Sequence, residues 1–273
     1  MNKIILNLAF IALTTSLFAQ EAADKKVQGG LVAGFGINFQ KMGTKLIATD
    51  GLGTDLTIGA NVNFSLSETI GFNTGIEFDF ETLKYKSAGE NIYYRYNDSD
   101  ILNKEDSGTD PNNEMFLMAA RKQKATYITI PTMLLFRTKF IGYFRYFGKF
   151  GLRNSILLSS TITDQGYNFP LDINPVVETA SAESFTNENM TASGEMFIFK
   201  SSVGLAGGAE WNFSGSTCLV AELGYYYGFT PLHGNKKEDK SFLYTTDITG
   251  TTPAYFSNKA TQGQLMLKVS ILF

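Results

Sequence analysis

The sequence predicts an all-β protein that forms a single antiparallel, up-and-down transmembrane β-barrel of about eight strands with long extracellular loops. Three observations lead to this fold class. About eight segments alternate between apolar and polar residues, the connections between them alternate between short and long, and the polar positions combine charges with glycines. An alternation with a period of two is the side-chain repeat of a β-strand.

The N-terminal segment predicts an export signal. Lys3 provides a positive start, residues 4–18 provide a short apolar stretch, and we expect cleavage after Ala19. Asn7 and a Thr-Thr-Ser cluster interrupt the stretch, which disfavours a membrane anchor, and no later run reaches the roughly 18 apolar residues of a membrane helix. We therefore divide the chain into a signal peptide, residues 1–19, and an outer-membrane β-barrel domain, residues 20–273.

The composition disfavours several classes of function. The net charge is −3 and the basic residues are not clustered, so nucleic acid is not an expected partner. The single cysteine, Cys218, excludes an intrachain disulfide and cysteine-rich metal sites, and the single histidine, His233, removes most zinc sites. We expect no catalytic residues, no cofactor and no metal site.

Each predicted strand has one apolar face and one face of charges and glycines. In residues 70–80, Phe78 and Phe80 share one face, while Glu77 and Asp79 share the other. A soluble β-sandwich also alternates, but charges at mid-strand among many glycines fit a narrow barrel interior better. The other segments are residues 31–39, 56–64, 127–137, 144–156, 197–211, 219–227 and 265–273, and the remaining mid-strand charges are Arg145, Lys149, Arg153, Lys200, Glu210, Glu222 and Lys268.

The connections predict the orientation of the barrel. Short links at residues 65–69, 138–142 and 214–216 alternate with long links, three of which run to about 30 residues, well beyond ordinary loop lengths. Outer-membrane barrels have short periplasmic turns, longer extracellular loops and an aromatic girdle at each interface. The predicted girdles are Phe64, Phe72, Phe136, Phe144, Trp211 and Phe273 toward the short turns, and Phe39, Phe197, Tyr225, Tyr227 and Phe229 toward the long loops.

The predicted interior is crowded with charge. An open sheet edge in lipid would leave backbone groups unpaired, so the sheet must close, and about eight strands enclose a lumen that side chains just fill. The mid-strand charges named above, which face this lumen, include both basic and acidic side chains in nearly equal numbers. Because they nearly balance, we expect a salt-bridge network that plugs the barrel, since buried charges are tolerated when they are paired. A selectivity lining for a small pore is the alternative.

Several stretches resemble the PorT-type outer-membrane β-barrel protein family. They are "NTGIEFDFETLKYK", "YITIPTMLLFRTK", "SSVGLAGGAEWNF", "LVAELGYYYGFT" and "LMLKVSILF". The most recognisable stretch is residues 127–135, in which an aromatic residue is followed by "ITIP" and a pair of leucines. The resemblance spans nearly the whole mature chain. It implies a location in the outer membrane of a Gram-negative cell and, for one branch of the family, a part in type IX protein secretion. It transfers no catalytic residue.

One histidine raises the question of catalysis. His233 follows Pro231 in the last long loop, and nearby Ser241 and Asp239 could join it in a lipid-modifying site at the barrel rim. The sequence contains no serine-based motif, and general-base catalysis needs a geometry that loop sequence does not define. We therefore expect an exposed loop histidine without a catalytic role.

Three other residues have simpler interpretations. Cys218 is expected on the lumen side near the periplasmic end as a small filler, and Trp211 is expected to anchor the barrel at the membrane interface. Phe273 ends an alternating C-terminal strand, which predicts the signal that the outer-membrane assembly machinery reads. A closing strand with an interfacial aromatic is the alternative for Phe273.

The long loops offer the best place for function. Residues 87–116 mix tyrosines with acids, which suits contact with protein or glycan, and residues 164–195 hold six acids without lysine or arginine. Because no regular ligand spacing is present, we expect a solvated, self-repelling loop rather than a divalent cation site. We expect residues 92–96 to extend a strand beyond the bilayer, and a hidden hairpin would raise the strand count to ten.

The sequence favours a non-enzymatic barrel that acts as a scaffold or interaction partner linked to protein secretion. A small passive pore and, less favoured, a lipid-modifying barrel enzyme are the alternatives. The expected partners are membrane lipid, the outer-membrane assembly machinery and a protein that contacts the loops.

Overall fold

The computed structural model describes residues 26–108, 113–169, 183–215, 217–234, 240–246 and 252–273. The predicted signal peptide and its cleavage after Ala19 lie outside these residues. Within the described ranges, no helix combines the length and the apolar character needed to span a membrane.

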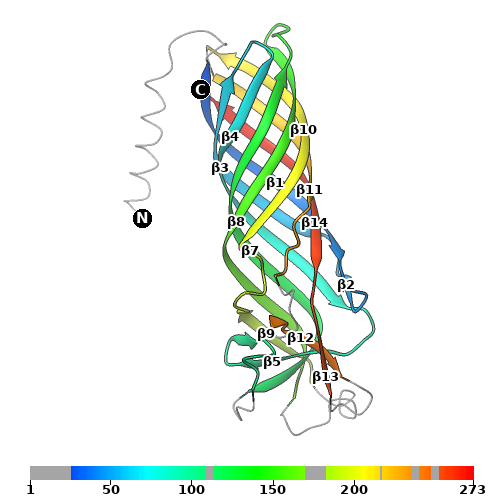
Figure 1. The fold of residues 1–273 in the computed structure, drawn as a ribbon. Helices are drawn as coiled ribbons and strands as arrows, with labels where there is room; N and C mark the ends of the chain where they lie inside the picture. Colours follow the sequence, from blue (N-terminus) through cyan, green and yellow to red (C-terminus); the bar gives the residue numbers. More distant parts are fainter. Residues whose placement is uncertain (1–25, 109–112, 170–182, 216, 235–239, 247–251) are drawn as a thin grey trace, which may run out of the picture.

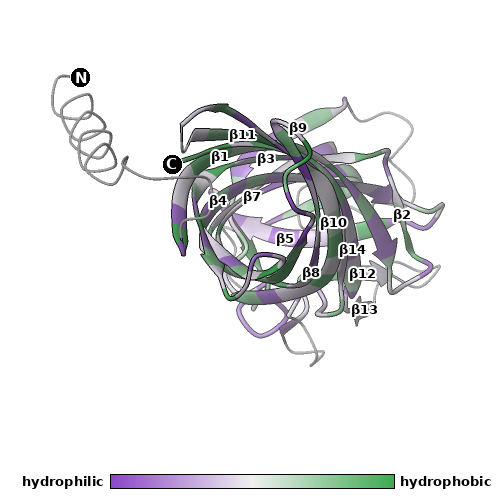
Figure 2. Ribbon diagram, turned by 90° about the horizontal axis from the view of Figure 1, so that it is seen from above, coloured by the Kyte–Doolittle hydropathy of each residue, from purple (hydrophilic) through white to green (hydrophobic). Residues whose placement is uncertain are grey.

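Eight long strands close a barrel, which confirms the predicted fold class (Figures 1 and 2). Each strand pairs with the next in antiparallel register, in the order β1–β3–β4–β7–β8–β10–β11–β14, and β14 pairs back onto β1. A closed ring has no unpaired edge for lipid to meet. The strands are β1 (Val27–Met42), β3 (Gly53–Ser65), β4 (Ile70–Ser87), β7 (Glu114–Arg137), β8 (Phe144–Phe169), β10 (Phe199–Ser214), β11 (Thr217–Gly228) and β14 (Ala260–Leu272).

The outer face of the ring is an apolar band. Phe35, Leu205 and Leu267 are more than half exposed, which is the arrangement of a surface that faces lipid rather than water. The predicted aromatics that are exposed at the two ends of this band are Phe64, Phe136, Phe144 and Trp211 near the short turns, and Phe39, Tyr225, Tyr227 and Phe229 near the long connections.

The inner face of the ring leaves little room between strands. A Cβ atom placed on Gly151 of β8 would lie 2.2 Å from the carbonyl oxygen of Thr132 on β7. Glycine at this position therefore allows the two backbones to approach, while longer side chains from other strands fill the lumen.

Beyond the apolar band, the strands continue into a folded extracellular head. β5 takes the place of β4 beside β7, β12 pairs with β5, β9 pairs with β8, and β2 pairs with β4. We use "head" for these short strands, the hairpin partners β6 and β13, and the extensions of β4, β7 and β8 (lower end of Figure 1). The short strands are β2 (Ile47–Thr49), β5 (Ile92–Asn97), β6 (Asp100–Leu102), β9 (Phe185–Met190), β12 (Leu243–Thr246) and β13 (Pro253–Phe256).

The head has a hydrophobic core of its own, which combines aromatic and aliphatic side chains. The rings of Tyr94 and Phe116 lie 5.2 Å apart between centroids, and Tyr96 packs edge-on against both. Buried residues from β2, β4, β5, β6, β7, β8, β9 and β12, together with Phe242 before β12, complete this cluster. The strand predicted at residues 92–96 is confirmed as β5, but the ring keeps eight strands because β5 pairs outside it.

Candidate functional site

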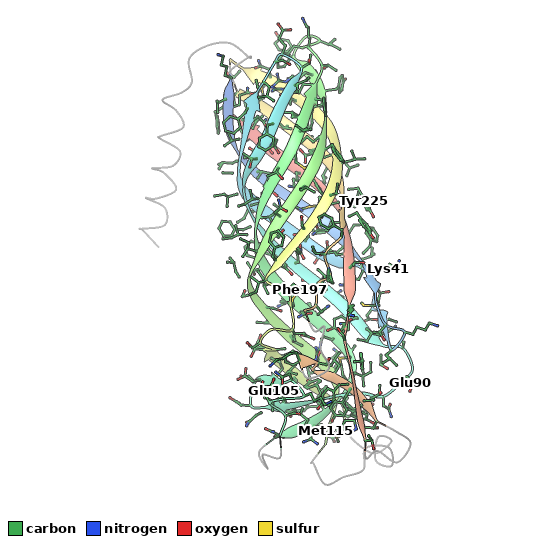
Figure 3. All side chains as sticks on the ribbon, in the orientation of Figure 1. Lys41, Glu90, Glu105, Met115, Phe197 and Tyr225 are labelled. Carbon is green, nitrogen blue, oxygen red and sulfur yellow. The ribbon has the colours of Figure 1, made fainter. Side chains whose placement is uncertain are left out.

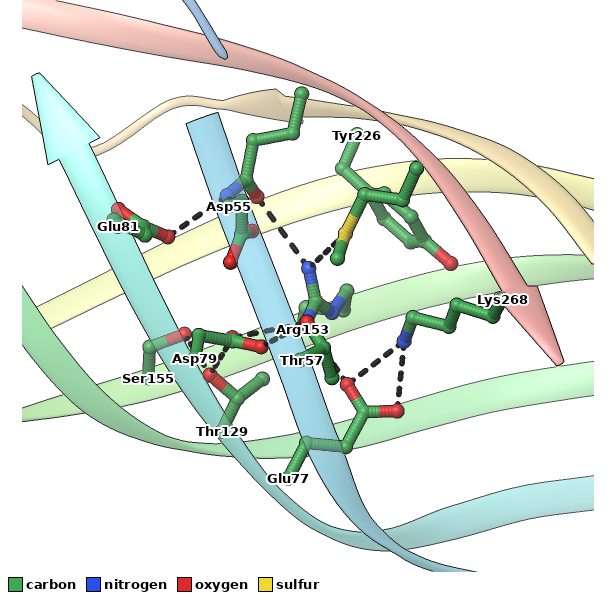
Figure 4. Close-up of polar contacts among 12 residues, drawn as sticks. Asp55, Thr57, Glu77, Asp79, Glu81, Thr129, Arg153, Ser155, Tyr226 and Lys268 are labelled. Atoms are coloured by element: carbon green, nitrogen blue, oxygen red, sulfur yellow. Dashed lines mark hydrogen bonds and ion pairs between the residues drawn. The ribbon is translucent and has the colours of Figure 1, made fainter. Parts of the chain in front are cut away.

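The lumen at mid-barrel contains a cluster of ion pairs centred on Arg153 (Figure 4). The Arg153 guanidinium lies 2.8 Å from a carboxylate oxygen of Glu77 and 2.9 Å from one of Asp79. The Lys268 ammonium lies 2.7 Å from Glu77 on its other side. Thr57 donates a hydrogen bond of 2.6 Å to Asp79. These five side chains come from strands β3, β4, β8 and β14, so the cluster ties together strands from different parts of the barrel wall.

Further pairs extend the network along the barrel axis. Toward the periplasmic turns, the Lys149 ammonium lies 2.6 Å from Glu222, and Arg145 pairs with Glu210. Toward the head, Lys200 pairs with Glu81. The predicted pairing of lumen charges is therefore confirmed, and these charges are buried. Buried ion pairs of this kind are stable only when both members are present.

The network leaves almost no free space around it. A void lined by Asn61, Glu77, Lys149 and Tyr226 among others has a volume of about 10 Å³. That volume is about the room that one water molecule needs. A hydrated solute does not fit into a void of this size.

A second polar cluster lies in the head, beyond the lipid-facing band. Arg121 of β7 makes two hydrogen bonds, of 2.7 and 2.8 Å, to the Asp164 carboxylate of β8. Its remaining amino group lies 3.0 Å from Glu195, which belongs to the segment between β9 and β10. All three side chains are buried, and burial raises the pKa of Asp164 and of Glu195, against the opposing effect of Arg121. This cluster joins the connection between β9 and β10 to strands β7 and β8.

The position of His233 differs from the predicted exposed loop. The side chain is 2% exposed, and its Nε2 atom lies 3.2 Å from the Gln123 side-chain oxygen. The Tyr85 ring meets it edge-on at 6.2 Å. Burial beside the Arg121 guanidinium lowers the pKa of His233 to about 3, so the imidazole is neutral. The prediction of exposure was wrong because the chain after β11 folds inward over the barrel mouth.

The structure does not bring Ser241 or Asp239, the two residues that could have formed a catalytic site with His233, into a described contact with it. Among the described residues, the hydrogen-bond partner of the imidazole is Gln123 rather than Ser241, whose carbonyl accepts a hydrogen bond from the Lys104 amide. Asp239 lies outside the described residues. In the described part of the chain, no group of three or more histidine, cysteine or acidic side chains is arranged to hold a metal ion.

Three other predicted positions lie where the sequence placed them. Cys218 is buried on the lumen side near the short turns, where it packs with Leu135 and Leu272. Trp211 faces outward at the same end and stacks on Phe144 with 6.2 Å between centroids. The Phe273 amide donates to the Gly29 carbonyl and so continues the closing strand pair.

Sequence reasoning missed several members of both clusters. Asp55 and Glu81 face the lumen, but each lies one residue outside the predicted segments, and continuing the alternation by one position would have found them. Arg121 and Gln123 lie in a stretch that the sequence assigned to a long link. The acidic segment of residues 164–195 was expected to be solvated, yet Asp164 and Glu195 are both buried against Arg121.

The closed ring, the apolar outer band and the polar interior define an integral outer-membrane β-barrel. The model of the outer membrane protein beta-barrel domain family matches residues 18–234, and the chain belongs to this family. No curated protein sequence matches the chain.

Similar solved structures include barrels with different described roles. Ail, the attachment invasion locus protein of Yersinia pestis, is 11% identical with a TM-score of 0.31, over 91% of this chain and 100% of that chain. Neisserial surface protein A is 8% identical with a TM-score of 0.31, over 91% and 98%. The outer membrane protease OmpT of Escherichia coli is 8% identical with a TM-score of 0.33, over 90% and 95%. Scores this low carry no argument about function.

Proposed function

We propose that this protein is a non-enzymatic outer-membrane barrel, closed to solutes, that holds a folded extracellular head in place for contact with a protein partner. The observation that carries the proposal is the combination of a filled lumen with a packed head. A pore needs free volume along its axis, and the ion pairs around Arg153 occupy it. A rigid scaffold, in contrast, benefits from strands that are tied together internally.

The resemblance to the PorT-type family supports a partner in protein secretion. In that interpretation the head, or the short turns on the opposite side, contacts another component of the secretion apparatus. The C-terminal strand that ends at Phe273 would serve as the signal for the outer-membrane assembly machinery. A lipid-modifying role finds less support, because His233 is buried and its imidazole is neutral. A lipid substrate would need the imidazole to be open to the membrane or to solvent.

The scaffold role predicts crosslinks that depend on position. Photoreactive amino acids placed in the cell at Glu90, Asp98 and Glu105, which are exposed on the head, should capture one protein repeatedly (Figure 3 labels Glu90 and Glu105). The matched controls are the lipid-facing Phe35 and the periplasmic-turn residue Glu68. Adducts are identified by mass spectrometry. If the head positions give no adduct beyond those of Phe35, the head is not a contact surface.

The closed lumen predicts an electrically silent protein. The purified barrel, shown to be folded by its heat-modifiable migration in SDS gels, should give no steady conductance in a planar lipid bilayer. The physical reason is that ions would have to displace buried salt bridges to pass. Reproducible open-channel steps that grow with salt concentration would replace the scaffold proposal with a passive pore.

A further inference from the structure

A patch of three lysines lies on the outer surface, just beyond the lipid-facing band. Lys122 and Lys124 of β7 are exposed, and Lys84 of β4 is half-buried, while the residues between them point inward. In the antiparallel register, Lys84 lies directly opposite Lys122, and Thr82 lies opposite Lys124. Two lysines at directly opposite positions repel each other, so this arrangement is unfavourable unless an anion lies between or beside them.

The acid beside this patch is Asp50, whose amide donates a hydrogen bond to the Lys84 carbonyl, but its carboxylate pairs with Lys86. Among the described residues, none of the three lysines belongs to an ion pair, whereas the next lysine on β4, Lys86, pairs with Asp50 at 3.3 Å. On the opposite side of β7, the outward positions facing Lys122 and Lys124 are Thr163 and Thr161 of β8. The patch therefore presents three cations and three hydroxyl groups on three adjacent strands: Lys84, Lys122, Lys124, Thr82, Thr161 and Thr163.

The depth of the patch places it at the lipid headgroups. On the same outward face, Phe80 is the last large apolar residue of β4, and it is followed by Thr82 and Lys84. At about 3.3 Å per residue and a tilt of about 45°, Lys124, which lies opposite Thr82, is about 5 Å further from the bilayer centre than Phe80, and Lys84 is about 9 Å further, at the outer limit of the headgroup layer. The polar headgroup layer extends roughly 5–8 Å beyond the hydrocarbon on each side. On β1, Lys41 follows the girdle residue Phe39 in the same way (Figure 3).

We propose that this patch binds the phosphate groups of a phosphorylated lipid in the outer leaflet. Phosphate offers the negative charge that the lysines lack and oxygen acceptors for both the ammonium and hydroxyl donors. A soluble anion would have the same chemistry. However, the patch adjoins the lipid-facing band directly, so the phosphate of a lipid anchored in that band reaches the lysines with little further loss of conformational freedom. The bound lipid would cover the junction between the barrel and the head on the β4–β7–β8 side.

The test compares binding of a bis-phosphorylated glucosamine lipid, lipid A, with binding of its dephosphorylated form. Native mass spectrometry of the detergent-solubilised full barrel measures the affinity. The triple variant K84Q/K122Q/K124Q should bind lipid A at least about tenfold more weakly, since each lysine near an anionic lipid surface contributes about fivefold. The matched control, K26Q/K139Q/K240Q, removes the same charge at exposed positions elsewhere and should bind like the parent.

A stability measurement separates loss of the site from loss of the fold. In phosphate-free detergent, the triple variant should have a thermal midpoint equal to or above that of the parent, because the repulsion between Lys84 and Lys122 is gone. Adding lipid A should raise the midpoint of the parent but not of the triple variant. Equal affinity of the parent and the triple variant for lipid A, or equal binding of the dephosphorylated lipid, would overturn the proposal. Inorganic pyrophosphate binding as tightly as lipid A would overturn the assignment to a lipid.

Discussion

Replacing Arg153 with methionine should destabilise the barrel by about 3–5 kcal/mol. The variant removes the cation that lies between Glu77 and Asp79. Glu77 would keep Lys268, but Asp79 would keep only hydroxyl donors from Thr57 and Thr129. Breaking a buried ion pair by removing one partner leaves an uncompensated charge, and that charge accounts for the size of the loss.

Urea titration of the folded barrel, followed by the fluorescence of the single tryptophan Trp211, measures this loss. The matched control is Lys139→Gln, which breaks a solvent-exposed pair with Glu68 and should leave the urea midpoint close to that of the parent. The double variant D79N/R153M should recover part of the stability, because it removes both charges of the pair. An R153M midpoint equal to that of K139Q would mean that the network adds little to the stability of the barrel.

Replacing Arg121 with leucine should loosen the head while the barrel stays closed. The variant leaves Asp164 and Glu195 buried without their shared cation, at a cost of about 3–5 kcal/mol. Because these two acids hold β8 and the β9–β10 connection against β7, the penalty falls on the head. Limited proteolysis with mass spectrometry should therefore find new cleavage sites in the head, with heat-modifiable migration of the barrel retained.

The control for this experiment lies in the head as well. Lys240→Gln removes an exposed cation paired with Glu105 and should leave the proteolysis pattern unchanged. If R121L resists the protease as well as K240Q does, the packed aromatics around Tyr94 and Phe116 hold the head without help from the polar cluster. If the barrel itself loses heat-modifiable migration in R121L, the head and barrel unfold as one cooperative unit.

The barrel could be predicted from the sequence because each of its strands has one face toward lipid and one toward a polar interior. In the sequence, this difference between the two faces appears as an alternation of apolar and polar residues, as in Phe78, Asp79 and Phe80. The pairing of lumen charges followed from their balance, but the individual partners did not. Lys149 and Glu222, for example, lie 73 positions apart along the chain, and only the closed ring brings them together.

The head was mostly missed because its strands lose this alternation. Met115, Phe116, Leu117 and Met118 are buried one after another at the start of β7. When both faces of a strand are covered, the pattern becomes a continuous apolar run that does not identify a strand by itself. A register shift after Met118 on β7 and another near Leu158 on β8 also reverse which residues face inward. The burial of His233 depends on contacts with residues that are distant in the sequence, and the residues next to it in the loop do not predict those contacts.

The two longest strands set the height at which this protein can meet another molecule. β7 has 24 residues and β8 has 26, and both run without interruption from the periplasmic turn into the head. At about 3.3 Å per residue, each is a rod of roughly 80 Å measured along the strand. Because β7 and β8 pass directly from the membrane part into the head, the two parts share the same continuous strands. The proposed contact surface for a protein partner would therefore lie at one fixed level above the cell surface.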